Sequence, residues 1–209
     1  NDYHSVLKNK ILRIYEKLKT HSPQISGRFF VDTAPVLEKI WATEAGLGWI
    51  GKNSLLIIPQ KGSYYFIGIL ILDAELEYDN PFTKNYCGNC SKCIEACPGK
   101  AIVAGKTINS NNCISYKSIE EKSLLSKEQY PETNYIFGCD ICQDVCPWNR
   151  FSTPTKESEF LDVNEMVNYS NLDFQNLTVD KYKYIISQSP ISRCKYEKFM
   201  NNICNASHI

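Results

Sequence analysis

The sequence predicts an α+β fold with three consecutive parts, and three observations support this prediction. Apolar residues in the first twenty positions recur at helical spacing, two apolar runs bounded by turn residues follow as candidate strands, and a cysteine-rich region comes next. Helical spacing returns near the C-terminus. We therefore expect a helix-and-sheet part over residues 1–80, a ferredoxin-like cysteine module over 81–152, and a small helical tail over 153–209.

The first part is expected to begin with an amphipathic helix over residues 2–20. One face of such a helix would carry Leu7, Ile11, Ile14 and Leu18, and the His-Ser-Pro sequence that follows ends it. The aromatic and β-branched residues 29–31 then predict a short strand.

A second helix is expected over residues 36–45, between a proline at its start and Gly46 at its end. Residues 54–58 and 64–72 have the composition of strands. Because the five residues between them form a turn sequence, we expect an antiparallel hairpin. The acidic, turn-rich stretch 73–85 is expected to be a linker.

The glycine-rich segment 46–53 matches two nucleotide-binding patterns, G-x-G-x-x-G and G-x-x-x-x-G-K. Both patterns bind phosphate where a strand leads through glycines into a helix. Here the expected order is helix, glycines, strand, and Asn53 replaces the serine or threonine that would hold magnesium. We therefore do not predict a nucleotide site. The glycines still permit close approach of the backbone to a large group, and Lys52 directs a cation toward it.

The first cysteine run is Cys87-x-x-Cys90-x-x-Cys93-x-x-x-Cys97-Pro98, which is the bacterial ferredoxin pattern. In that pattern three closely spaced thiolates hold one 4Fe–4S cluster, and the cysteine before proline ligates a second cluster. The run therefore predicts two clusters and a protein that transfers electrons.

The second run, Cys139-x-x-Cys142-x-x-x-Cys146-Pro147, has Ile136 where its first cysteine would stand, and Cys113 is the expected replacement. Each cluster then receives four thiolates. Cluster 1 is expected to be held by Cys87, Cys90, Cys93 and Cys146, and cluster 2 by Cys97, Cys113, Cys139 and Cys142.

Zinc and disulfides are the alternatives for these cysteines. Zinc binds CxxC pairs, but its sites close at four ligands and do not need the longer run. Disulfides need an oxidising compartment, and no signal peptide is visible. Cys194 and Cys204 remain outside both clusters and are expected to be buried or half-buried thiols in a helical segment.

Composition limits which binding partners and which cellular location we expect for this chain. The 209 residues have zero formal net charge, so no overall field attracts nucleic acid or membrane. The longest apolar run is too short to cross a bilayer, and free thiolates indicate a reducing, cytoplasmic location. We expect a monomer without membrane association. Tail helices are expected near 161–169, 179–187 and 192–204.

Residues 31–38 (VDTAPVLE) and 45–53 (AGLGWIGKN) resemble the epoxyqueuosine reductase family, and the similarity continues through both cysteine runs to residues 189–193 (SPISR). That family uses cobalamin and iron–sulfur clusters in tRNA queuosine synthesis. The resemblance implies that residues 1–80 form part of a cobalamin-binding domain, and that the family's segment ahead of Asp2 is missing. It also implies an external electron donor and, as substrate, a tRNA with epoxyqueuosine in its anticodon loop.

Reduction of an epoxide to an alkene takes two electrons and releases the oxygen as water, so an acid must protonate that oxygen. The resemblance assigns this acid to Asp32, whose apolar neighbours are expected to desolvate it and keep it protonated. Local sequence alone favours a helix cap or an Asx-turn instead.

The resemblance also implies contacts to a base-off cobalamin, because no histidine lies in the motifs to ligate it; His4 and His21 are expected to be solvated. Ordinary strand core is the alternative for Leu56 and Ile67, and a turn cap is the alternative for Asp140. Besides Asp32, the expected contacts are Lys52, Asn53 and Ser54 at the corrin edge, Leu56 and Ile67 against its face, and Ser115 and Asp140 near cluster 2.

Arg193, Lys195 and Lys198 are expected to contact tRNA phosphates as a basic stripe on the last helix, with a solvated helix face as the alternative. Two other functions are the alternatives for the whole chain. A reductive dehalogenase shares cobalamin and two clusters, but is typically exported and lacks the two blocks above. An electron-carrier ferredoxin would not need the long segment before the first cysteine.

Overall fold

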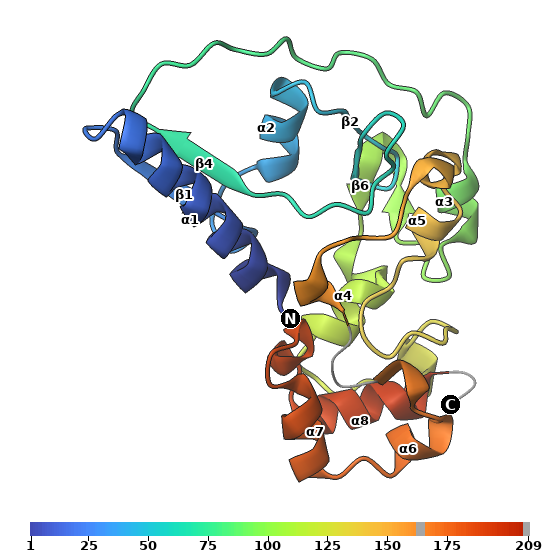
Figure 1. The fold of residues 1–209 in the computed structure, drawn as a ribbon. Helices are drawn as coiled ribbons and strands as arrows, with labels where there is room; N and C mark the ends of the chain where they lie inside the picture. The colour runs from blue at the N-terminus through green and yellow to red at the C-terminus, as the bar shows by residue number, and fades with distance from the viewer. Residues whose placement is uncertain (162–165, 207–209) are drawn as a thin grey trace. The chain divides into compact units, whose positions relative to one another are not determined.

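The computed structural model describes residues 1–161 and 166–206, and these residues confirm an α+β fold (Figure 1). They form two compact units that interleave along the chain. Unit 1 contains Asn1–Gly51, Leu55–Gly88 and Pro147–Phe160, and unit 2 contains Lys52–Ser54, Asn89–Cys146 and the described part of Leu161–Ile209. The sequential division into 1–80, 81–152 and 153–209 stays a prediction.

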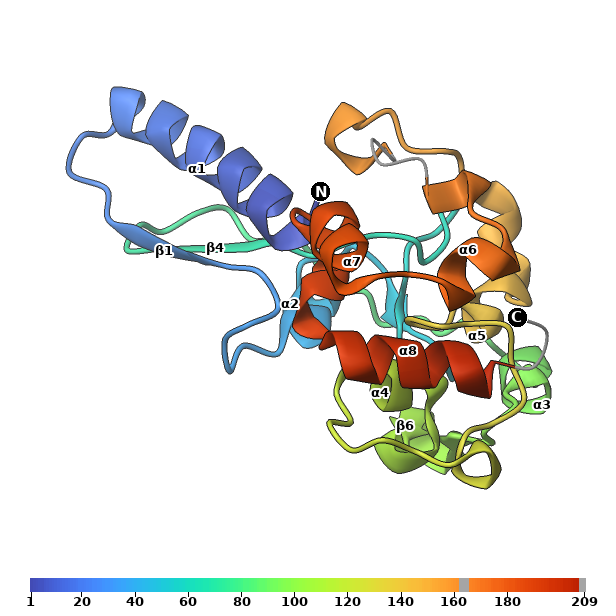
Figure 2. The same cartoon turned by 90° about the horizontal axis from the view of Figure 1, so that it is seen from below.

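Unit 1 is built on a helix and a two-stranded ribbon. Helix α1 (Tyr3–His21) packs on β1 (Gly27–Phe30) and β4 (Ile69–Leu72), which pair antiparallel, and Figure 2 shows α1 running along this ribbon. The Asp2 carboxylate caps α1 by accepting a hydrogen bond from the backbone N–H of His4 at 2.9 Å. The predicted helix is therefore confirmed, and the predicted strand lies one to two residues earlier than expected.

The hairpin expected between residues 54–58 and 64–72 is wrong. β3 (Leu56–Ile57) pairs with β2 (Trp49–Ile50), whereas β4 pairs with β1, so the two runs belong to different sheets. β2 is closer to β3 in sequence than β4 is, and the Trp49 side chain of β2 is 2% exposed, in contact with the rings of Phe82, Tyr86 and Trp148. The turn after β3 closes on itself through an Ile58–Gly62 bridge and then releases the chain toward β4.

Helix α2 (Glu38–Glu44) lies inside the predicted range, and the chain leaves it through Gly46 in the left-handed region, with φ of 73°. At Gly48 a Cβ atom would lie 2.0 Å from the Ile57 carbonyl oxygen, so only glycine lets this segment approach β3. The glycine-rich segment thus joins a helix to a strand, which is the order that excludes a phosphate-binding loop.

Unit 2 carries most of the cysteine module and the described part of the tail. In this unit β5 (Ile102–Val103) pairs antiparallel with β6 (Thr107–Ile108). The module's helices are α3 (Lys92–Ala96), α4 (Ile114–Ile119) and α5 (Ile141–Asp144). The tail's helices are α6 (Asn171–Gln175), α7 (Val179–Ile186) and α8 (Tyr196–Asn205).

The tail has an apolar core of its own, in which Tyr182, Ile185, Phe199 and Ile203 are almost fully buried. Helix α8 also packs against α4 of the cysteine module, as Figure 2 shows. The predicted helices at 179–187 and 192–204 are confirmed, although a 3₁₀ turn over Pro190–Arg193 delays the start of α8. The helix expected near 161–169 falls partly outside the described residues. Among the residues that are described, no helix is both long enough and apolar enough to cross a bilayer.

Candidate cluster sites and acid site

The structure brings together the four cysteines assigned to cluster 2. Burial raises the pKa of the Cys139 thiol, and the nearby Cys113 and Cys97 raise it further. Burial, followed by the charges of Cys139, Cys113, Cys93 and Cys97, raises the pKa of Cys142 to about 12, so Cys93 of the proposed cluster 1 also lies near. Without metal these thiols resist ionisation, whereas a cationic iron–sulfur core would offset their mutual repulsion. The four donors therefore fit such a cluster.

Close backbone packing builds the cluster 2 loops. A Cβ atom at Gly99 would lie 1.9 Å from the Asn112 carbonyl oxygen, so glycine lets the loop after Cys97 approach the residue before Cys113. The Cys97 sulfur accepts a hydrogen bond from the Ala101 backbone N–H at 3.3 Å. Hydrogen bonds to ligand sulfurs are typical of iron–sulfur sites.

The ligands assigned to cluster 1 are divided between the units. Cys90, Cys93 and Cys146 lie in unit 2, on or beside α3 and α5, which pack against each other. Cys87 belongs to unit 1, where Trp49 Nε1 donates to its sulfur at 3.5 Å. Within the described residues, no three His, Cys, Asp or Glu side chains are arranged to hold a single metal ion.

Lys52 and Asn53 hold the cysteine loops of unit 2. Lys52 Nζ donates to the Cys90 carbonyl oxygen at 2.8 Å, and Asn53 Nδ2 donates to the Cys142 carbonyl oxygen at 3.3 Å. Asn53 is buried, at 4% exposed. Sequence reasoning missed this role, because nothing local to the glycine-rich segment indicates that its two following side chains support distant loops.

The other residues expected to contact the corrin differ in burial and in their hydrogen-bond partners. Leu56 is a core residue of unit 1 at 6% exposed, which matches the strand-core alternative, and Ile67 is half-buried. Ser54 adopts a left-handed backbone and donates its hydroxyl to the Lys106 carbonyl oxygen. Ser115 is half-buried in α4, and Asp140 occupies the N-cap position of α5, with its carboxylate accepting from Gln143 Nε2 at 2.6 Å.

Asp32 lies in the loop after β1 with a left-handed backbone, φ 58°, which is uncommon outside glycine. Its Oδ2 accepts a hydrogen bond from Tyr3 Oη at 2.6 Å. Two expectations are wrong. The side chain is 55% exposed, so its apolar neighbours in sequence do not enclose it, and it does not cap α2, whose N-cap residue is Leu37.

His4 is also not the solvated residue expected. It is 9% exposed, and its Nδ1 lies 2.7 Å from Asp2 Oδ1. Its Nε2 lies 3.7 Å from Asp32 Oδ2. The arrangement depends on α1 packing against β1, a contact between distant segments, so the helix start alone could not reveal it.

A cavity of about 920 Å³ opens in unit 1. Exposed Tyr64, Tyr65 and Phe66 form an aromatic wall, and residues 152–156 add hydroxyls and a lysine. The Phe66 ring stacks on Tyr3 with centroids 4.3 Å apart. The cavity therefore adjoins the tyrosine that binds Asp32.

The expected basic stripe in the tail is wrong for Lys198. This side chain is 5% exposed, and its Nζ donates to the Ser123 carbonyl oxygen at 3.0 Å; burial lowers the pKa of its ammonium group. Arg193 and Lys195 are exposed just before α8. Cys194 is buried as expected, but Cys204 is exposed.

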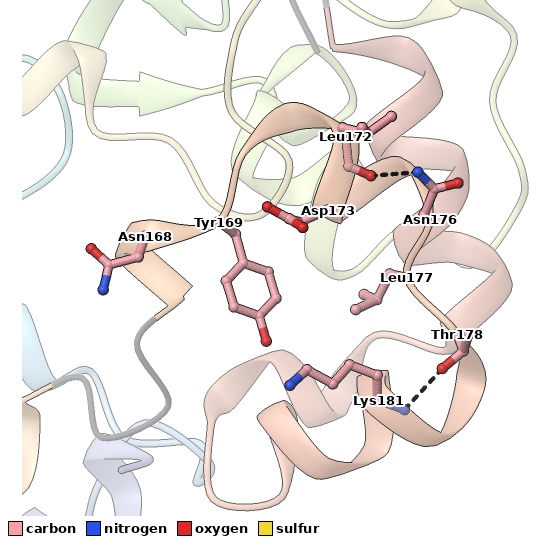
Figure 3. Close-up of a pocket in the computed structure, with 8 residues that line it drawn as sticks. All are labelled: Asn168, Tyr169, Leu172, Asp173, Asn176, Leu177, Thr178 and Lys181. Carbon is pink, nitrogen blue, oxygen red and sulfur yellow. Dashed lines mark hydrogen bonds between the residues drawn. The ribbon is translucent and has the colours of Figure 1, made fainter.

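A second cavity, of about 630 Å³, lies within the tail (Figure 3). Tyr169, Asp173, Asn176 and Lys181 contribute polar groups to its wall. Figure 3 shows the Tyr169 ring and the Lys181 side chain reaching in from opposite sides, with Lys181 Nζ 5.7 Å from the ring centroid. The hydroxyl of Thr178 accepts a hydrogen bond from the Lys181 backbone N–H at 3.3 Å and caps α7.

Comparison with known proteins assigns the family. Residues 86–149 match the profile described as "4Fe-4S double cluster binding domain". An epoxyqueuosine reductase of Cyclobacterium marinum is 44% identical over 97% of this chain. Another, from Synechocystis sp., is 38% identical over 93% of this chain and 68% of its own length. This chain belongs to the epoxyqueuosine reductase family.

Solved epoxyqueuosine reductases have the same fold. One, bound to a tRNA-Tyr stem loop modified with epoxyqueuosine, is 28% identical, with a TM-score of 0.86 over 98% of this chain. Another, from Bacillus subtilis, is 27% identical with a TM-score of 0.86, and has its catalytic aspartate loop swung out of the active site. This chain spans 54% of each of these structures and 64% of the Cyclobacterium relative.

Proposed function

We propose that this chain forms part of an enzyme that reduces epoxyqueuosine to queuosine in tRNA, with two 4Fe–4S clusters and cobalamin. The observation that carries the proposal is a double-cluster cysteine module in the same chain as an exposed carboxylate held by a tyrosine. The family relative bound to an epoxyqueuosine-modified stem loop supports the substrate.

The two clusters would be held as the cysteine spacing indicates, with four thiolates each. They would pass single electrons inward from an external donor. The assignment of cluster 2 is supported by Cys97 and Cys113, which lie near Cys139 and Cys142; Cys93, assigned to cluster 1, lies near Cys142 as well. The assignment of cluster 1 rests on the spacing of Cys87, Cys90 and Cys93, together with Cys146.

Cobalamin has a broad apolar macrocycle with amide groups along its edge, and the unit 1 cavity offers matching chemistry. Tyr64, Tyr65 and Phe66 would hold the face, while Ser152 and Lys156 would bind the edge. The bound cofactor supplies a strong nucleophile and reductant for a ring carbon. We still assign Ile67 to the face of the macrocycle, and we still expect cobalamin to be bound in its base-off form.

Asp32 would act as the acid at the departing oxygen. Its carboxyl gives a proton to that oxygen and becomes a carboxylate, which the Tyr3 hydroxyl stabilises through the existing hydrogen bond to Oδ2. The left-handed backbone places the side chain on an exposed loop rather than in the core. The swung-out aspartate loop of the Bacillus relative supports a loop that moves, so substrate binding would complete the enclosure that this structure lacks.

The test is Asp32→Asn in protein loaded with cobalamin and both clusters. The amide keeps the shape and the hydrogen bond from Tyr3 but cannot donate a carboxylic proton. We expect conversion of epoxyqueuosine-tRNA to fall at least ~100-fold, with cofactor spectra unchanged. Asp180→Asn, on the exposed face of α7, is the matched control and should retain full activity. Full turnover by Asp32→Asn would remove Asp32 from the chemistry.

A further inference from the structure

A buried histidine stands between two carboxylates in unit 1. His4 Nδ1 lies 2.7 Å from Asp2 Oδ1, and its Nε2 lies 3.7 Å from Asp32 Oδ2. The imidazole is almost enclosed, with 11% of its side chain exposed, whereas the outer carboxylate of Asp32 is 55% exposed. The three groups therefore form a row that begins at the start of α1 and ends at the proposed acid.

The row gives each histidine nitrogen a separate role. Asp2 Oδ1 also accepts the backbone N–H of His4 at 2.9 Å, so the carboxylate is fixed in place as the helix cap. An ionised carboxylate can only accept hydrogen bonds, so Nδ1 carries a proton toward Asp2. Nε2 is left facing Asp32, where it can hold or release a second proton.

Reduction of an epoxide to an alkene consumes two protons, and a single carboxyl group can supply only one of them. The balanced change is epoxide plus two electrons plus two protons, giving alkene and water. The electrons come from the proposed cobalamin and iron–sulfur cofactors. Asp32 stores a single proton, so it must be reprotonated before the oxygen can leave as water.

We propose that His4 is the residue that reprotonates Asp32 between the two transfers. The Asp32 carboxyl gives its proton to the oxygen, and the His4 imidazolium passes the Nε2 proton to Asp32 Oδ2. Asp32 then gives a second proton to the same oxygen, the remaining C–O bond breaks, and water departs. His4 regains its proton from solvent after turnover. This inference rests on the proposed function.

Other groups around the row fix its geometry. The Tyr3 ring packs on the His4 ring with centroids 4.1 Å apart, and its hydroxyl binds the same Asp32 oxygen that faces Nε2. The Asp32 backbone N–H donates to a Glu38 carboxylate oxygen from α2. The titratable groups to be considered in any pH profile of His4 are thus Asp2, Tyr3, Asp32 and Glu38.

The test is His4→Gln in the protein loaded with cobalamin and both clusters. Glutamine keeps hydrogen-bonding groups but does not titrate. We expect unchanged cofactor spectra, unchanged binding of epoxyqueuosine-tRNA, and a turnover number lowered about 100-fold. The pH dependence of turnover in His4→Gln should differ in shape from that of the wild type, because glutamine does not titrate. Free imidazole should restore part of the rate to His4→Ala.

Controls separate the possible outcomes. His21→Gln, at the exposed end of the same helix, should behave as wild type. Asp2→Asn keeps the helix cap and replaces His4→Gln if that variant does not fold. It should also change the shape of the pH dependence of turnover. If His4→Gln, or Asp2→Asn in its place, has the rate and the pH profile of the wild type, the inference about His4 is overturned and the proposed function is not affected. A fully loaded wild-type protein that leaves epoxyqueuosine-tRNA unchanged overturns the proposed function, and this inference with it.

Discussion

At the scale of single residues, one buried amide joins the tail of unit 2 to its cysteine module. Asn202 of α8 is fully buried, and its Nδ2 donates to the carbonyl oxygens of Ser118 at 2.9 Å and Ile136 at 3.0 Å. The Ser118 hydroxyl in turn accepts from the Gly138 backbone N–H at 3.0 Å, beside Cys139. One side chain thus fixes the backbone on two sides of the cluster 2 ligands.

Asn202→Ala should therefore destabilise the protein strongly. The change leaves two buried carbonyl groups without this donor, at about 1–3 kcal/mol for each group left unsatisfied. We expect the free energy of unfolding, measured by anaerobic urea denaturation, to fall by roughly 2–4 kcal/mol. Cys204→Ala, two residues further along α8 but exposed, should change it by less than about 0.5 kcal/mol. A loss below about 1 kcal/mol for Asn202→Ala would show that the tail does not support the loops in this way.

At the scale of elements, the cysteine loops show what spacing can predict. The ferredoxin pattern predicts Cys113 as the substitute ligand although it lies outside both runs, and in the structure Cys113 lies near Cys139 and Cys142. The loop after Cys97 reaches it because Gly99 has no side chain. The expected ligands can therefore be proposed from a pattern that repeats in sequence, whereas the close approach of the loops depends on a glycine whose partner is not visible in sequence.

Reconstituted protein should carry about eight irons in two clusters, and Cys113→Ala should lose one cluster. Iron and acid-labile sulfide analysis would measure this directly. Cys194→Ala and Cys204→Ala should keep the full iron content, because neither thiol belongs to a cluster loop: Cys194 is buried in the tail core and Cys204 is exposed. Loss of iron in either control would mean that the ligand assignment is incorrect.

Secondary structure was predictable where local sequence decides it. Apolar spacing and caps located α1, α2, α7 and α8 to within a few residues. The hairpin prediction failed because β3 pairs with β2, which is closer in sequence, and β4 pairs with β1, a distant segment that no local pattern indicates. Helical periodicity could not show that α8 buries Lys198, whose ammonium is satisfied by a carbonyl 75 residues away in sequence.

The candidate site was predictable only in part. The family resemblance located Asp32, but its partners Tyr3 and His4 come from a helix start with no motif of its own. Lys52 and Asn53 were identified as special residues, yet their hydrogen-bond acceptors are backbone carbonyls in the cysteine loops. Contacts of this kind depend on tertiary structure, which a pattern in one segment does not encode.

At the scale of the whole molecule, zero net charge means that the proposed binding of tRNA would depend on local cations. Arg193 and Lys195 remain exposed candidates for binding phosphates. Replacing both with alanine should weaken tRNA binding and reduce the slope of log K against log salt by roughly 0.7 to 0.9 for each phosphate that the protein no longer neutralises. Filter binding across a salt series would measure the slope.

Lys198→Met is the matched control for that experiment, because its buried ammonium is engaged by the Ser123 carbonyl oxygen. It should leave the salt slope unchanged, even if it lowers stability. An unchanged slope in the Arg193→Ala, Lys195→Ala double variant would mean that this surface does not bind phosphate.

The interleaving of the two units has a consequence for how the protein is made. Unit 1 includes Pro147–Phe160, and the Lys10–Glu157 ion pair and the Phe66–Phe160 ring contact both need that segment. A ribosome adds about 5–20 residues each second, so several seconds pass between the synthesis of the segment ending at Gly88 and that of Pro147–Phe160. All eight proposed cluster ligands have been synthesised by then, since Cys146 directly precedes Pro147. Metal loading of the nascent chain can therefore begin before unit 1 closes.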